Sequence, residues 1–143
     1  MGRPLREDEA RRLPPLVLAY VGDAVYELYV RSRLAGTGGG ARRLHAEGVR
    51  RVSAPGQERV WHVLERELSD VEAEVARRGR NAKANVPQHV DPATYRRSTA
   101  LEAVLGYLYL TGREERIVSL LDGAFAAVFA SVETNEHEAG DPS

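Results

Sequence analysis

The stretch from Leu16 to Leu34 is apolar on nearly every side of a helix and yet carries a carboxylate, Asp23, in its middle. A helix that is apolar all round is buried in a core or in an interface. An unpaired ionised carboxylate in such surroundings destabilises the fold strongly, so Asp23 needs a partner or a bound cation. The chain must therefore fold around this helix and supply a partner for the acid in its middle.

A second segment repeats the arrangement, because Glu102 lies within the otherwise apolar run from Ser98 to Leu110. Both segments carry a central glycine, Gly22 and Gly106, although glycine costs about 1 kcal/mol relative to alanine inside a helix. We interpret the glycines as positions where the two helices, or a helix and a ligand, approach closely. Two carboxylates on closely packed helices repel unless a cation lies between them, and oxygen ligands favour Mg²⁺ or Mn²⁺. One alternative stays open, in which each acid pairs with an arginine such as Arg31, Arg96 or Arg97.

Helical spacing of apolar residues recurs along the whole chain, and no segment shows the sustained alternation typical of a strand. We predict helices over residues 16–34, 41–52, 55–68, 69–79, 91–111 and 113–132. The sequence thus predicts an all-α single domain over residues 14–132. Residues 1–13 are expected to be an irregular N-terminal segment, and residues 133–143 a disordered acidic tail.

The composition limits the compartment and the partners. The chain has no cysteine, which excludes a disulfide scaffold and thiolate metal sites. Its purely apolar runs, such as Leu16–Gly22, are far shorter than the roughly 20 residues that span a membrane. We expect a cytoplasmic protein without membrane contact. The net charge of −1 is unevenly distributed. Residues 1–132 carry 20 basic and 17 acidic side chains, and the tail carries acidic side chains but no lysine or arginine.

Three motifs resemble one known family. The string Ala-Tyr-Val-Gly-Asp-Ala-Val-Tyr-Glu at 19–27 resembles the signature helix of the ribonuclease III family. The run at 98–110 resembles the second acidic helix of that family. Residues 77–83 and 95–99 are similar to its compact branch, called Mini-ribonuclease III. The resemblance covers roughly residues 14–121, with the motifs in the expected order.

This resemblance implies a helical homodimer that cuts double-stranded RNA. Metal-activated water would attack a phosphodiester and leave a 5′-phosphate and a 3′-hydroxyl. Asp23 and Glu102 match the catalytic, metal-binding acids, which implies Mg²⁺ as cofactor, with Mn²⁺ able to substitute. Tyr20 matches an aromatic residue of the dimer interface. The compact branch is associated with maturation of large-subunit (23S) ribosomal RNA.

Two positions depart from the larger enzymes of the family. Those enzymes carry acids where this chain has Ala19 and Thr99, and the compact branch shares the reduction. We therefore expect one tightly held metal whose shell is completed by water or RNA. Glu27 and Thr99 are candidates for its outer shell.

We expect this domain to hold the RNA itself, because the sequence leaves no room for the double-stranded-RNA-binding domain of the larger enzymes. Duplex RNA is recognised mainly through phosphates and 2′-hydroxyls, which favours a basic surface. The predicted RNA-binding residues, from one basic segment and the start of the next helix, are Arg77, Arg78, Arg80, Asn81, Lys83, Arg96 and Arg97. Two alternatives remain: a non-catalytic RNA-binding relative, and an all-α nucleotide pyrophosphohydrolase.

Overall fold

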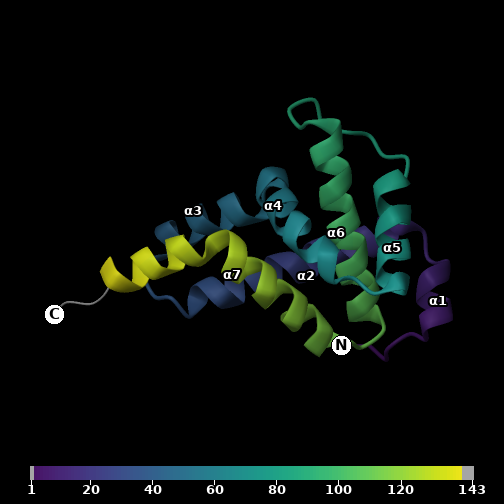
Figure 1. Cartoon of the computed structure of the whole chain (residues 1–143), viewed down its shortest axis with the longest axis horizontal. Coiled ribbons are helices and arrows are strands. Elements are labelled where there is room, and N and C mark those ends of the chain that lie inside the picture. Colours follow the sequence, from purple (N-terminus) through teal and green to yellow (C-terminus); the bar gives the residue numbers. More distant parts are fainter. Residues whose placement is uncertain (1, 140–143) are drawn as a thin grey trace.

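The structure is a computed structural model that describes the backbone of residues 2–139 and the side chains of residues 2–129. This part of the chain is helical and contains no strand, which confirms the predicted all-α fold. None of the helices so described combines the length and apolarity needed to cross a membrane. The elements are, in chain order (Figure 1), α1 (Glu7–Arg12), α2 (Pro15–Ala35), α3 (Ala41–Val52), α4 (Ala54–Leu64), the 3-10 helix η1 (Glu65–Glu67), α5 (Asp70–Asn81), α6 (Pro92–Leu110) and α7 (Glu114–Ala139).

Local capping signals set several helix boundaries as predicted. At the start of α5, the Ser69 hydroxyl accepts a hydrogen bond from the Glu72 amide at 3.2 Å, and the Glu72 carboxylate accepts one from the Ser69 amide at 2.8 Å. At the start of α6, the Asp91 carboxylate accepts a hydrogen bond from the Thr94 amide at 3.1 Å. Such caps satisfy amides that have no partner inside the helix. The third predicted helix is shorter than expected, because α4 ends at Leu64.

Two segments predicted to be irregular are partly helical instead. The N-terminal segment contains α1, whose Ala10 is fully buried, and the Leu5 amide donates to the Leu110 carbonyl at 2.7 Å. A helix of six residues is too short to show a periodicity, and tertiary contacts hold it. The last helix continues past Val132 to Ala139, because extending an existing helix is far easier than starting one. Residues 140–143 of the predicted tail lie outside the described residues.

Helix α6 runs through the centre of the domain, and α2, α4, α5 and α7 pack against it (Figure 1). From Ser98 to Leu108, every residue of α6 except Glu102 is buried. Glu102 is partly exposed. The apolar run around this acid in the sequence is therefore explained by the central position of the helix.

Helix α2 has one face in the core and one face open to solvent. On the inner face, Leu18 is 1% exposed and Tyr26 is fully buried. On the outer face, Tyr20 is 82% exposed and Leu28 is 61% exposed. In the single chain, the predicted burial is thus found on one face only, and Asp23 is exposed rather than buried.

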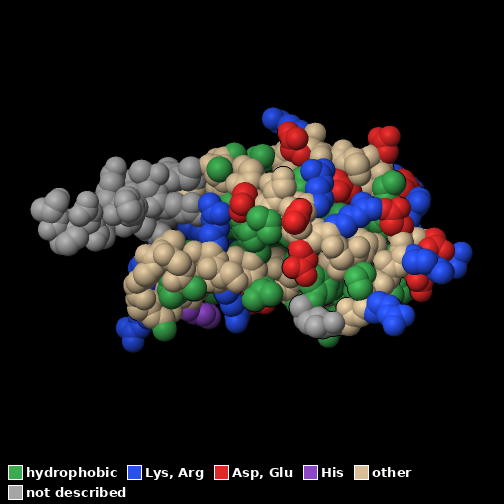
Figure 2. Space-filling view, turned by 90° about the horizontal axis from the view of Figure 1, so that it is seen from below, with side chains coloured by type: hydrophobic (Ala, Val, Ile, Leu, Met, Phe, Trp, Pro, Cys, Tyr) green, Lys and Arg blue, Asp and Glu red, His purple; other side chains and the backbone are tan. Residues whose placement is uncertain are grey.

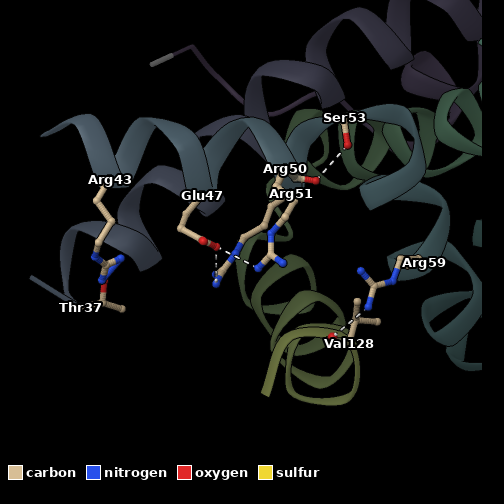
Figure 3. Close-up of polar contacts among 8 residues, drawn as sticks. All are labelled: Thr37, Arg43, Glu47, Arg50, Arg51, Ser53, Arg59 and Val128. Atoms are coloured by element: carbon tan, nitrogen blue, oxygen red, sulfur yellow. Dashed lines mark hydrogen bonds and ion pairs between the residues drawn. The ribbon is translucent and has the colours of Figure 1, made fainter. Parts of the chain in front are cut away.

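Two arginines fasten α7 to α3 and α4 (Figure 3). The side chain of Arg51 is fully buried, and its guanidinium carbon lies 4.9 Å from the centre of the Phe129 ring. Arg59 lies 5.6 Å from the centre of the same ring and donates a hydrogen bond to the Val128 carbonyl at 3.4 Å. Some of the basic residues outside the 77–97 segment therefore serve the packing of the domain.

Candidate active site

The crossing of α2 and α6 brings the two predicted metal-binding carboxylates together. A Cβ atom on Gly22 would lie 1.6 Å from the Glu102 carbonyl oxygen, and one on Gly106 would lie 1.9 Å from the Leu18 carbonyl oxygen. Only glycine permits two helix backbones to approach so closely. This confirms the predicted reason for both glycines, since helix meets helix at each of them. Asp23 follows Gly22 directly, so the close approach sets it beside Glu102.

Asp23 and Glu102 share a cleft of about 290 Å³. Ala19 and Thr99, which stand where larger ribonuclease III enzymes carry acids, line the same cleft. The four positions that are acidic in the larger enzymes therefore line one cleft, and this chain has a carboxylate at two of them. The complete lining consists of Leu16, Ala19, Tyr20, Asp23, Ala84, Tyr95, Thr99 and Glu102.

The cleft disfavours the ionised form of Glu102. Burial raises the pKa of this carboxyl group, and the hydrogen bond and negative charge of Asp23 raise it further, to about 8. A hydrogen bond with Ser98 acts in the opposite direction. At neutral pH and without a bound cation, Glu102 therefore carries a proton. The energetic reason is that the ionised carboxylate would be poorly hydrated in the cleft and would also be repelled by the negative charge of Asp23.

The arginines that could have neutralised these acids have other partners or, among the described residues, no partner. Arg31 forms an ion pair with Glu27 at 2.6 Å, one turn away on α2. Arg97 forms an ion pair with Glu58 on α4. Across the described side chains, neither acid of the cleft has a basic partner within ion-pair distance. The pairing alternative left open by the sequence is therefore excluded for these arginines.

The donor set fits a magnesium ion held by few protein ligands. Mg²⁺ usually keeps several waters and takes one or two carboxylates together with phosphate oxygens. The raised pKa of Glu102 reflects first its burial and then the neighbouring Asp23, and a divalent cation between the two carboxylates would favour the ionised form against both. The residues that the structure describes contain no cluster of three or more His, Cys, Asp or Glu side chains able to hold a metal. A cation here would take its remaining ligands from water or substrate.

One wall residue of the cleft, Tyr95, was missed by sequence reasoning. It lies on α6 one turn before Thr99 and two turns before Glu102, and this spacing puts all three on one side of the helix. The Thr99 hydroxyl donates a hydrogen bond to the Tyr95 carbonyl at 3.0 Å. The same periodicity that indicated a helix could therefore have found Tyr95. Glu27, in contrast, lines a separate groove between α2 and α3.

Three of the predicted RNA-binding residues are engaged within the protein. Arg77 donates to both carboxylate oxygens of Glu74, at 2.9 and 2.6 Å. Arg78 donates to the Arg11 carbonyl at 2.6 Å and so ties α5 to the end of α1. Arg97 has its partner on α4. These side chains are restrained by protein contacts.

The other four residues surround a hollow beside the cleft: Arg80, Asn81, Lys83 and Arg96. All four side chains are exposed. Arg80, Lys83 and Arg96 form no ion pair with any other described residue. On the face shown in Figure 2, basic and acidic side chains are instead interspersed, with apolar side chains between them. The structure thus divides the predicted RNA-binding residues into an engaged and a free group.

An all-α domain whose two crossing helices each present a carboxylate to one cleft has the architecture of a ribonuclease III domain. Residues 16–113 match the family described as Ribonuclease III domain, and the chain belongs to this family of endoribonucleases. A protein of Symbiobacterium thermophilum named Mini-ribonuclease 3 is 47% identical over 114 residues, which are 78% of this chain and 88% of that protein. The predicted resemblance to the compact branch is confirmed.

Two further comparisons extend over more of the chain. The Mini-ribonuclease 3 of Thermosynechococcus vestitus is 40% identical over 136 residues, which are 94% of this chain and 88% of that protein. The crystal structure of a Fusobacterium nucleatum protein has a TM-score of 0.75 and 26% sequence identity, covering 82% of this chain and 96% of that chain. The fold is therefore shared by a protein of known structure.

Proposed function

We propose that this endoribonuclease hydrolyses phosphodiester bonds in double-stranded RNA with Mg²⁺ and leaves a 5′-phosphate and a 3′-hydroxyl. The observation that carries the proposal is the pair of Asp23 and Glu102, held in one cleft by the glycine crossing. The names of the relatives support the same activity. We further propose a cytoplasmic role in maturing precursor large-subunit (23S) ribosomal RNA.

Asp23 and Glu102 would hold the metal, and Mn²⁺ would substitute for Mg²⁺. When bound, such a cation supplies a water nucleophile at neutral pH and neutralises charge that develops on the phosphate. Glu102 must release its proton for the cation to bind, because metal-ligating carboxylates are ionised. Thr99 remains a candidate for the outer shell, since its side chain lines the cleft. Glu27 is a weaker candidate, because Arg31 already holds its carboxylate.

The two alternatives differ from this proposal in the chemistry they require. A non-catalytic RNA-binding relative would need no metal pair, yet both carboxylates are present and share a cleft. A nucleotide pyrophosphohydrolase needs a dense acidic cluster, and no such group of three occurs among the side chains described here. We therefore favour RNA hydrolysis.

Cleavage assays with purified protein distinguish the three activities. We expect the wild type to cut a radiolabelled RNA duplex in Mg²⁺, to lose activity in EDTA, and to leave single-stranded RNA and nucleoside triphosphates intact. An Asp23→Asn variant should bind the duplex without cutting it. Intact duplex in every reaction would contradict the proposal, and hydrolysis of the nucleotides alone would favour the pyrophosphohydrolase.

We also propose that the outer face of α2 is the dimer interface, with Tyr20 at its centre. Exposed apolar side chains on one helix face are typical of interfaces, and Val17, Tyr20 and Leu28 are 42%, 82% and 61% exposed. A two-fold dimer would cover this patch with its own copy. The same helix carries Asp23, so the two active sites would lie next to the interface.

Tyr20→Asp is expected to yield a monomer, because a charge would be buried in the centre of an apolar interface. Sedimentation equilibrium should show dimer affinity weakened by at least about 100-fold. Ser119→Asp, at an exposed position of α7 and away from the outer face of α2, is the control and should remain dimeric. A wild type that is itself monomeric at micromolar concentration would contradict the proposed dimer.

A further inference from the structure

A second hollow adjoins the cleft that holds the two carboxylates. It has a volume of about 350 Å³ and lies where the end of α5, the following loop and the first half of α6 meet. Ala84, Tyr95 and Thr99 line both hollows and form the wall between them. The two hollows are therefore immediate neighbours on the surface of the domain.

The charged side chains that line this hollow are all basic. Arg80, Lys83 and Arg96 line it together with Asn81, and no acidic side chain does. Arginine and lysine side chains have only hydrogen-bond donors, so the complementary ligand must supply acceptors and negative charge. Because these three cations form no ion pair with another described residue, no internal bond has to break before such a ligand binds.

The shape of the hollow depends on a third glycine. A Cβ atom on Gly79 would lie 2.8 Å from the Ala103 side chain and 3.2 Å from the Thr99 carbonyl oxygen. This glycine lets α5 pack closely on α6 and brings Arg80 beside the wall that faces Glu102. The position of the cations relative to the carboxylates is therefore set by the helix packing.

We propose that this second hollow binds the backbone phosphate next to the scissile one, on the same RNA strand. Adjacent phosphates of one strand must occupy adjacent sites, and the shared wall makes the two hollows adjacent. A planar guanidinium can hold two phosphate oxygens at once, and Lys83 adds a point charge. Arg80, Lys83 and Arg96 are then positioning residues that fix which phosphate lies at Asp23 and Glu102. The inference rests on the proposed cleavage of RNA.

Two arginines of α5, three residues apart, provide a matched test. Arg80→Ala should weaken binding of an RNA duplex by about 10-fold in EDTA, where nothing is cut, and should lower the salt dependence by about one phosphate contact. Arg77→Ala removes the same charge from the same helix, but Arg77 is already paired with Glu74, so affinity should change less than about 2-fold. Equal effects of the two substitutions would overturn the proposal.

Uncharged methylphosphonate linkages then identify the phosphate that Arg80 contacts. A single methylphosphonate is placed in turn at each phosphate near the cut of one strand, and binding is measured for wild type and Arg80→Ala. For the wild type, the position next to the scissile phosphate should cost about 10-fold in affinity, whereas Arg80→Ala should lose clearly less there, since it has already lost the Arg80 contact and keeps only those of Lys83 and Arg96. Additive losses at every position would overturn the proposal.

The same assays separate this inference from the function on which it rests. A wild type that neither binds nor cuts duplex RNA contradicts the proposed function, and the inference falls with it. A wild type that binds and cuts the duplex but shows no coupling between Arg80 and any phosphate contradicts the inference alone. Circular dichroism of both variants checks that each is folded.

Discussion

Replacing Glu102 with glutamine is expected to abolish RNA cleavage and, in the same variant, to raise the free energy of unfolding at alkaline pH. The loss of activity follows from losing one of two metal-binding carboxylates. We expect a decrease in kcat/KM of at least about 1000-fold, equivalent to about 4 kcal/mol of transition-state stabilisation. Single-turnover cleavage of a duplex substrate measures this effect.

The gain in stability follows from the pKa of Glu102. The carboxyl group titrates near 4.5 when unfolded and at about 8 in the folded protein, so between these values the folded state binds the extra proton. The stability of the wild type therefore falls as the pH rises through this window, and the full penalty is present above it. Glutamine cannot ionise and escapes the penalty. After allowance for partial solvent exposure, we expect a gain of about 1–3 kcal/mol at pH 9.

Urea unfolding in EDTA at pH 5 and pH 9 tests the second effect. The wild type and Glu102→Gln should be of similar stability at pH 5 and diverge at pH 9. Glu115→Gln, which changes an exposed carboxylate at the start of α7, serves as the control and should show no such divergence. If Glu102→Gln were less stable than the wild type at both pH values, the Glu102 carboxyl group would stabilise the folded core, and the expected ionisation penalty would be contradicted.

Gly106→Ala is expected to destabilise the protein by at least about 3 kcal/mol, because the added methyl group overfills a contact between helices. The new Cβ atom would lie 1.9 Å from the Leu18 carbonyl oxygen, and backbone cannot rotate away as a side chain can. Helices α2 and α6 would have to separate, and Asp23 would move away from Glu102. Chemical unfolding measures the loss, and cleavage by the folded fraction should fall as well.

Gly123→Ala is the matched control for this effect. Gly123 also lies within a helix, but no neighbouring atom comes within 4 Å of the point that its Cβ atom would occupy, so alanine fits there without strain. Alanine should stabilise α7 by about 0.5–1 kcal/mol through its higher helix propensity. If Gly106→Ala were as stable as Gly123→Ala, the contact between α2 and α6 would have room for a methyl group, and the prediction would be wrong.

Local signals explain why much of the fold could be predicted from the sequence. The bounds of α3 agree with the prediction, and Ser69 and Asp91, where two helices were predicted to begin, cap α5 and α6. The convergence of Asp23 and Glu102 was also predictable, because each interrupts an apolar helix that carries a glycine. The signals for these features, a capping residue or a glycine beside a carboxylate in an apolar helix, lie within a few positions of one another, which a sequence displays directly.

Contacts between distant residues explain what could not be predicted. Arg78 and Arg80 look equivalent in the sequence, yet Arg78 bonds to the carbonyl of Arg11, 67 positions away. Arg97 finds Glu58 on α4, 39 positions away, and its neighbour Arg96 has no such partner among the described residues. The sequence shows the charges of a basic segment but not which of them the fold has already bound.

The division of α2 into a core face and an outer face changes how sequence variants of this helix should be judged. Exposure is commonly used as a measure of tolerance, and by that measure Leu28 would accept nearly any residue. Along α2, however, the inner face builds the core, Asp23 serves the cleft, and the outer face is our proposed dimer contact. Natural variation should therefore be as restricted at Tyr20 and Leu28 as at buried Tyr26.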